Sequence, residues 1–204
     1  MAINPSIEAH TKVEQWVELT DKGRILLHTG KVDIGQKIYT ALALIAAEEL
    51  DVDYDRVDVK RTETDIDPNE GFTSGSMSMQ HSGNALRMAS ATARHYMLNI
   101  AAEKLGVGVE SLEVEDGLIQ SRQTNAFVTY WELMSDRKFD ILVDENVKVK
   151  APKDHTKVGT MVLSKGITDI VSGTMSYIHD IKLPGMLHAR LVRPPHYLAS
   201  LESL

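Results

Sequence analysis

The chain has 204 residues, of which 43% are apolar and 25% are charged, with a formal net charge of −7. This acidic balance disfavours a general nucleic-acid-binding protein, which needs a basic face to displace counterions from phosphates. The chain contains no cysteine, which excludes disulfides, thiolate metal sites and iron–sulfur clusters held by its own residues.

The first part of the chain is predicted to form a loose arm followed by a β-hairpin. Residues 1–12 are polar and show no periodicity, which indicates a flexible arm. Apolar runs at about 13–19 and 24–29 flank a turn with the sequence Asp-Lys-Gly at 21–23. Such a pattern favours two antiparallel strands.

Two helices are predicted next, separated by a strand at about 57–62. The first helix is expected at 36–50, because its apolar residues recur on one face at the helical period. The second is expected at about 80–105 and is stopped by the glycines at 106 and 108. Its expected core stripe comprises Leu86, Ala89, Ala93, Met97, Ile100, Ala101 and Leu105.

Shorter elements are predicted in the second half of the chain. Residues 112–119 indicate two short strands around a Glu-Asp-Gly turn, and residues 130–134 a helical turn. The lysine-rich stretch at 146–165 has a weak pattern and is interpreted as an inter-domain linker that docks on a surface. Residues 166–195 are typical of β-structure, with strands at 175–183 and 187–192 around a Pro-Gly turn.

The predicted fold is therefore α+β. Residues 13–145 are expected to pack two main helices on a mixed sheet, and residues 166–204 to begin a second, β-rich domain. A hairpin with one covering strand cannot bury a core of its own, so that domain is incomplete. Its outer edge needs a further strand, from a continuation of this chain or from another molecule.

Common catalytic and metal-binding motifs are missing from the sequence. The eight histidines are scattered and form no HExxH or other paired spacing. Residues 65–76 fail as a calcium loop, because Glu70 and Ser76 occupy the positions of the required glycine and glutamate. Residues 106–111 lack the third glycine of a dinucleotide fingerprint and follow a helix. Hydrolysis by a pair of carboxylates stays open, although nothing singles out a pair.

Two loops that run into helices remain as candidate sites. They are GKVDIGQ at 30–36 and GFTSGS at 71–76. Helix N-termini present unpaired N–H groups and favour anions, and small residues let a ligand approach the backbone. Hydroxyl groups and the Gln36 amide add hydrogen-bonding capacity. The same features serve ordinary helix capping, so by themselves they do not decide between a site and a cap.

Several motifs in sequence order resemble a known family. GKVDIGQ leads into TALA at 40–43 and AAEEL at 46–50, and GFTSGS leads to GNALR at 83–87 and ATAR at 91–94. These runs resemble the molybdopterin-binding large subunit of the xanthine dehydrogenase and aldehyde oxidase family. Later runs resemble the opening of that family's hammerhead domain: YIHD at 177–180, LPGMLH at 183–188 and RPP at 193–195. The order is similar to the isoquinoline 1-oxidoreductase and nicotinate dehydrogenase branch.

The resemblance implies part of a molybdenum hydroxylase. Such enzymes insert a water-derived oxygen into a C–H bond of an N-heterocycle or an aldehyde. It implies a molybdopterin cofactor with Mo, in bacteria commonly the cytosine dinucleotide form, shared with a partner chain. The cofactor-binding residues that it implies here are Gly35, Gln36, Lys37, Thr73, Ser74, Gly75 and Ser76.

Two departures from the family pattern limit what this chain is expected to do. Lys37 stands where the family usually has a second glycine, and its side chain either crowds the pterin or holds a phosphate. The later segments that carry the family's catalytic glutamate have no counterpart here. We therefore expect no catalytic residue and no metal ligand in this chain, and no activity without partners. The sequence does not decide between a split subunit and a truncated fragment.

The implied partners follow from the same resemblance. They are the remaining molybdopterin subunit with its catalytic glutamate, an iron–sulfur subunit and, in many members, an FAD subunit, together forming a hetero-oligomer. No run approaches the about 20 apolar residues of a membrane span, and the first ten residues lack a secretion signal. A cytoplasmic location is expected unless a partner exports the chain.

Two other interpretations remain open. One is a catalytically silent structural or assembly module of the same family, which the missing segment and Lys37 favour. The other is an anion-binding regulatory domain of an unrelated family. A fold without a helix after residues 35–36 would favour the unrelated regulatory domain.

Overall fold

The predicted hairpin forms part of a mixed three-stranded sheet in the computed structural model, which describes residues 4–203. Strands β1 (Val17–Thr20) and β2 (Arg24–Leu27) are antiparallel, with Leu19 opposite Ile25. Strand β3 (Val57–Val59) pairs with β2 in parallel, because the connection between them crosses over through a helix. The sheet order is β1-β2-β3, and its one antiparallel and one parallel pair make it mixed, as predicted.

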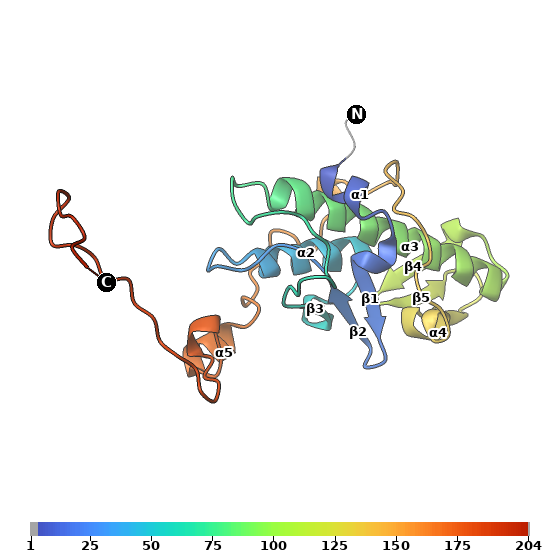
Figure 1. The fold of residues 1–204 in the computed structure, drawn as a ribbon. Coiled ribbons are helices and arrows are strands. Elements are labelled where there is room, and N and C mark those ends of the chain that lie inside the picture. The colour runs from blue at the N-terminus through green and yellow to red at the C-terminus, as the bar shows by residue number, and fades with distance from the viewer. Residues whose placement is uncertain (1–3, 204) are drawn as a thin grey trace. The chain divides into compact units, whose positions relative to one another are not determined.

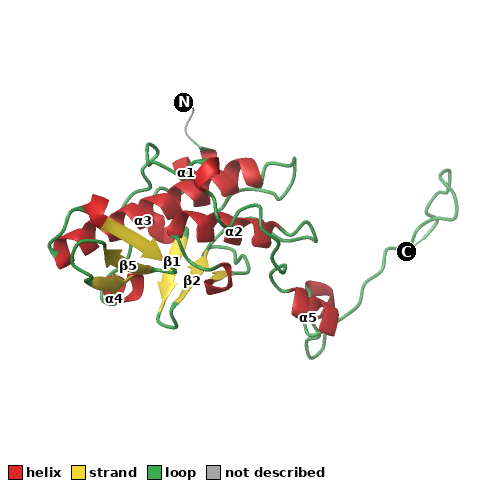
Figure 2. Ribbon diagram, turned by 180° about the vertical axis from the view of Figure 1, so that it is seen from behind, coloured by secondary structure: helices red, strands yellow, loops and turns green. Residues whose placement is uncertain are grey.

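The two main helices lie side by side and cover this sheet (Figures 1 and 2). Both begin later than predicted. Helix α2 spans Ile38–Leu50, because the residue before it adopts a left-handed conformation. Helix α3 spans Asn84–Leu105 and is preceded by one π-helical turn at Met79–Gly83. Gly106, with φ +65°, ends α3 as predicted.

A second sheet packs against the C-terminal half of α3. Strands β4 (Leu112–Glu115) and β5 (Leu118–Ser121) form the predicted tight hairpin, and β6 (Phe127–Thr129) extends it in antiparallel fashion. Strand β6 was not predicted, because its three residues are too few to show an alternating pattern. Helix α4 (Tyr130–Met134) follows directly and is capped by Thr129, as a serine or threonine before a helix favours.

The N-terminal segment differs from the predicted loose arm. Residues 1–3 lie outside the described part of the chain, but Pro5–Ala9 form the short helix α1. Asn4 caps this helix, and Ile7 is buried in the core. The prediction of a flexible arm was wrong here, because a single buried isoleucine and a cap are too weak a pattern to identify a five-residue helix.

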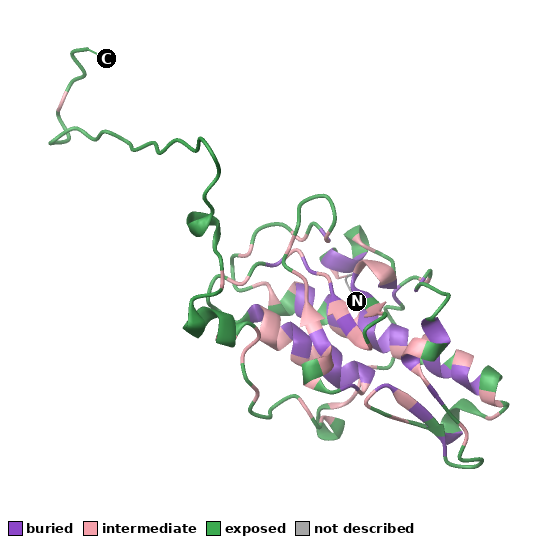
Figure 3. Ribbon diagram, turned by 90° about the horizontal axis from the view of Figure 1, so that it is seen from below, coloured by how far each residue is buried: buried purple, intermediate pink, exposed green. Residues whose placement is uncertain are grey.

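The core of the molecule lies between α2, α3 and the sheets, where Figure 3 shows the buried residues concentrated. Most of the predicted stripe of α3 is fully buried, whereas Ile100 and Leu105 are only partly buried. Short 3₁₀ turns connect the elements at Val13–Gln15, Tyr54–Arg56, Val109–Ser111, Pro152–Asp154 and Ile178–Asp180.

Residues 146–165, which we call the strap, pack against α2 without regular strands or long helices. The backbone N–H groups of Thr156, Lys157 and Val158 all donate to the Glu48 carboxylate. The N–H of Lys150 donates to Glu49 at 3.1 Å. Both glutamates of α2 are therefore buried beneath the strap, although acidic side chains are almost never buried without partners.

The chain divides into two units, Met1–Lys165 and Gly166–Leu204. In the second unit, helix α5 (Ile167–Ser172) forms where β-structure was predicted. The hairpin predicted at 175–192 is wrong for this structure, since residues 173–203 contain no strand in the described chain. Nearly all of the unit is exposed (Figure 3), so no packed face stabilises a hairpin. Across the described residues, none of the helices is long and apolar enough to span a bilayer.

Candidate functional site

The two loops singled out from the sequence lie at the same end of the first unit, where α2 and α3 begin (Figure 1). We call residues 30–37 the first loop and residues 71–77 the second loop. A hydrogen bond joins them directly: the N–H of Val32 donates to Oγ1 of Thr73 at 2.9 Å. The π-helical turn that follows the second loop also contacts α2. The fold therefore brings the two predicted segments together.

The first loop is held in shape by Asp33 and Gln36. The Asp33 carboxylate accepts from the N–H groups of Gly35, at 2.9 Å, and Lys37, at 3.3 Å. The Gln36 amide accepts from the N–H of Ile34 and donates to the carbonyl of Val32, at 2.6 and 2.9 Å. Both ends of this amide are thus engaged within the first loop. A ligand that used the Gln36 amide would have to replace these internal bonds.

The second loop exposes small residues in conformations that glycine favours. Gly71, Gly75 and Ser76 have φ values of +69°, +64° and +57°. A bond from the N–H of Ser74 to the carbonyl of Phe72 shapes the loop at 3.1 Å. Within the described chain, the N–H groups of Gly75 and Ser76 donate to no protein acceptor. They remain available to a ligand at the surface.

Lys37, the residue that departs from the family pattern, occupies the N-cap position of α2. Its φ of +61° lies in the left-handed region, and its side chain makes no cap hydrogen bond. The ammonium group instead donates to the Ser164 hydroxyl of the strap at 2.8 Å. The helix N-terminus is thus left without a side-chain acceptor, and a cation stands beside it.

We expect Lys37→Gly to raise the free energy of unfolding by about 1 kcal/mol, because a Cβ in the left-handed region costs roughly that amount. Lys37→Ala is the control, since it also removes the exposed contact with Ser164 but keeps the strained backbone. Urea unfolding of both variants measures the difference. Equal stabilities for the two variants would contradict this account of the cap.

Behind the loops, a chain of ionisable side chains stabilises residues 60–70. Nδ1 of His28 lies 2.8 Å from Asp67, and Nε2 lies 3.3 Å from Glu18. Burial alone would raise the pKa of Asp67, but hydrogen bonds from His28, the Glu63 N–H and Lys60 outweigh it, so the pKa lies below its ordinary value. Asp67 therefore stays ionised near neutral pH. No sequence motif marks this cluster, because its members are far apart in the chain.

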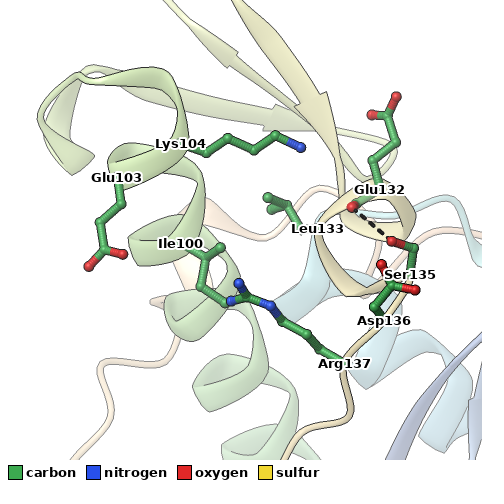
Figure 4. A pocket seen from close by; sticks show the side chains of 8 residues that line it. All are labelled: Ile100, Glu103, Lys104, Glu132, Leu133, Ser135, Asp136 and Arg137. Atoms are coloured by element: carbon green, nitrogen blue, oxygen red, sulfur yellow. Dashed lines mark hydrogen bonds between the residues drawn. The ribbon is translucent and has the colours of Figure 1, made fainter.

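Two cavities, of about 470 and about 490 Å³, lie away from the predicted loops. The first is lined by α3, α4 and the turn after α4 (Figure 4). Ile100 and Leu133 are its apolar residues, and its charged side chains have both signs. Glu132 in its wall is already engaged, because it accepts from the N–H and hydroxyl of Thr129, and these bonds lower its pKa. This cavity is a surface hollow without converging reactive groups.

The second cavity lies over β4 and β5, and its cationic lining residues are also engaged. Arg94 and Lys150 both bind Asp51, and the Arg94 bond is 2.6 Å long. Across residues 4–203, no group of three or more histidine, aspartate or glutamate side chains is arranged to hold a metal ion. None of the predicted site residues lines either cavity.

Comparisons with known proteins agree on one family. The family described as "Molybdopterin cofactor-binding domain" matches residues 1–169. A nicotinate dehydrogenase subunit of Pseudomonas putida is 34% identical over 194 residues, which cover 95% of this chain and 16% of that protein. The beta chain of isoquinoline 1-oxidoreductase from Brevundimonas diminuta is 26% identical, over 94% of this chain and 29% of that protein.

The fold is also similar to a solved structure. Reconstituted CO dehydrogenase from Oligotropha carboxidovorans superimposes with a TM-score of 0.51 and 27% identity, over 57% of this chain and 15% of that one. The chain therefore spans less than a third of the length of each of these relatives. What is shared is a segment of a larger subunit.

Proposed function

Because this chain belongs to the family of molybdopterin cofactor-binding domains, we propose that it contributes one wall of the cofactor site in a molybdenum hydroxylase. In this proposal, residues 13–145 are the cofactor-binding segment and residues 146–165 are the linker. Residues 166–204 are the start of a hammerhead domain that is completed by other residues. The alternative of a silent assembly module predicts the same fold without bound cofactor.

The observation that carries the proposal is the adjacency of the two loops at the starts of α2 and α3. Molybdopterin carries a phosphate, and free N–H groups together with a positive helix end favour anions. An added Cβ at Gly35 would meet no atom within 4 Å, so the space beside the loop is open. The donors of Gly75 and Ser76 and the ammonium of Lys37 suit an anionic group. The residues present therefore fit this cofactor.

We assign the chain a binding role rather than a catalytic one. The bound cofactor would supply the redox chemistry of hydroxylation, with water as the source of oxygen. The first loop would orient it through residues 35–37, and the second would hold its phosphate-bearing part through residues 73–76. The glutamate that acts as base belongs to the remaining molybdopterin subunit in this proposal. The chain alone is then inactive.

The finer parts of the proposal concern the cofactor form and the partners. We propose the cytosine dinucleotide form, with iron–sulfur clusters and FAD on partner subunits of a cytoplasmic hetero-oligomer. The absence of cysteine supports the placement of iron–sulfur clusters on other chains, because their usual ligands are cysteine thiolates. An N-heterocycle or an aldehyde is the proposed class of substrate.

Replacing Gly75 with valine tests the proposal. We expect Gly75→Val to lower the pterin content of the purified complex about tenfold or more, because a branched side chain blocks close approach to the backbone. Gln36→Ala should lower it as well, with little effect on unfolding, since Gln36 is exposed. The measurements are molybdenum analysis and the fluorescence of the oxidised pterin.

Gly106→Val is the matched control for the backbone strain. Gly106 has a φ of +65°, nearly equal to the +64° of Gly75, and open space beside it, but it lies at the far end of α3. The Gly106→Val variant should lose about as much stability as Gly75→Val, but the complex that contains it should keep a normal pterin content. Normal pterin content in Gly75→Val would remove the second loop from the site. A wild-type complex without molybdenum and pterin would favour the silent module.

A further inference from the structure

A buried lysine lies directly beneath the two loops. Lys31 is only 2% exposed, and its ammonium group donates to the carbonyls of Glu70 and Phe72 at 2.7 and 3.1 Å. Lysine is almost never fully buried unless it is paired, because burying its charge is costly. Here its partners are backbone atoms at the start of the second loop. These two hydrogen bonds offset part of the cost of burying the ammonium group, and they fix the place where the second loop leaves the core.

Glu70 makes the complementary connection. One carboxylate oxygen accepts from the hydroxyl of Thr29 and the N–H of Gly30, both at 2.8 Å. The other oxygen accepts from the hydroxyl of Ser82 at 2.5 Å. Ser82 lies in the π-helical turn before α3 and is fully buried. A single carboxylate therefore links the start of the first loop, the start of the second loop and the start of α3.

Thr29, Lys31, Glu70 and Ser82 together form what we call the clamp. The bonds between its segments join residues that are 12 to 41 positions apart in sequence. Every member lies close to the start or the end of a loop, and none belongs to the predicted ligand-binding set. Hydrogen bonds to charged groups are stronger than neutral ones, so the clamp is a stiff support. Its geometry sets the separation of the two loops.

We propose that the clamp is a positioning device that holds the first and second loops at the separation needed to bind one anionic ligand across both. This inference rests on the proposed function, because the ligand is the molybdopterin phosphate region. The clamp residues do not touch the ligand. They order the loops in advance, so that free N–H groups face the ligand before it arrives.

Thr29 offers the sharpest test, because valine has nearly the shape of threonine but lacks the hydroxyl. Thr29→Val deletes the donor to Glu70 and the acceptor for the N–H of Lys31, whereas Thr29→Ser keeps both. Hydrogen–deuterium exchange of the full chain should be about tenfold faster in Thr29→Val at the hydrogen-bonded N–H groups of residues 71–77, which are those of Gly71, Ser74 and Met77, as expected for the loss of one such hydrogen bond. Thr29→Ser should restore the wild-type rate.

The second readout is the pterin content of the purified complex, which we expect to fall about tenfold in Thr29→Val and to recover in Thr29→Ser. Val128→Ala is the stability control, since Val128 is buried in β6, in the other sheet. Val128→Ala should lower the melting temperature about as much as Thr29→Val does. Its hydrogen–deuterium exchange at 71–77 and its pterin content should nevertheless equal those of the wild type. Lys31→Met is a second clamp variant with the same expected pattern as Thr29→Val.

The outcomes separate this inference from the proposed function. Wild-type exchange at 71–77 in Thr29→Val overturns the clamp, whatever the pterin content. Faster exchange with normal pterin content also overturns it, because the loops would then move without affecting the ligand. If Gly75→Val keeps its pterin as well, the proposed function fails together with the ligand-binding part of the clamp. Faster exchange and pterin loss in Thr29→Val, both rescued by serine, support the clamp.

Discussion

Replacing Gly30 with alanine is expected to lower the free energy of unfolding by about 3 kcal/mol, at the upper end of what overpacking costs. An added Cβ would lie 2.1 Å from the carbonyl oxygen of Pro68 and 2.8 Å from the backbone nitrogen of Glu70. Both atoms belong to the backbone of the crossing segment, so neither can rotate away as a side chain can. The two segments would have to separate, and the bond from Gly30 to Glu70 would break.

Gly108→Ala is the matched control for this clash. Its added Cβ also meets an atom at a short distance, 2.2 Å, but that atom is a carboxylate oxygen of the exposed Glu110 side chain. A flexible side chain moves aside at little cost, so this variant should change stability by less than about 0.5 kcal/mol. Urea unfolding measures both variants. Equal and small losses would contradict the close backbone approach at Gly30.

The helices and hairpins of the first unit were largely predictable, because local patterns determine them. The stripe of α3 continues for many turns, and Gly106 supplies the left-handed residue that ends it. The starts of both helices were placed too early. A left-handed lysine and a π-helical turn are exceptions to the usual geometry, and periodicity carries no signal for either.

The family resemblance assigned both loops to one cofactor, but no local pattern places them side by side. Residues 31 and 72 are far apart in sequence, and no local pattern requires that a buried ammonium join them. Glu70 was considered in the sequence only as a residue that fails a calcium motif. Its role depends on three donors from two other segments, which only the tertiary structure brings together. Polar contacts between distant segments were the least predictable part of the site.

The strap is a second region whose contacts could not be predicted from the sequence. Its lysines suggested a surface linker, yet its backbone N–H groups supply the partners of a buried glutamate. Helix α2 ends at Leu50, as predicted, and Asp51 provides its left-handed C-cap. The sequence pattern did not show that Glu48 and Glu49 face the strap. Composition therefore identified the segments, but not which of their atoms bind each other.

Glu48→Ala is expected to lower the free energy of unfolding by about 3–5 kcal/mol, the cost of breaking a buried charged contact by removing one partner. The carboxylate accepts from the N–H groups of Thr156, Lys157 and Val158, at 2.7–3.1 Å, and from the Lys150 ammonium at 3.5 Å. Its removal leaves these donors without that acceptor beneath the strap. Glu103→Ala, at an exposed position of α3, should stay within about 0.5 kcal/mol of the wild type.

The pH dependence of stability provides the independent check on Glu48. Burial alone would raise its pKa, but the three backbone N–H groups and Lys150 outweigh burial and bring the pKa below its ordinary value. A carboxyl group with a lowered folded pKa stabilises the protein above its unfolded pKa, and this contribution is lost as the pH falls through the folded pKa. The stability difference between the wild type and Glu48→Gln should therefore be largest near neutral pH and shrink on acidification. A difference that stays constant down to acidic pH would mean that the charge of Glu48 does not hold the strap.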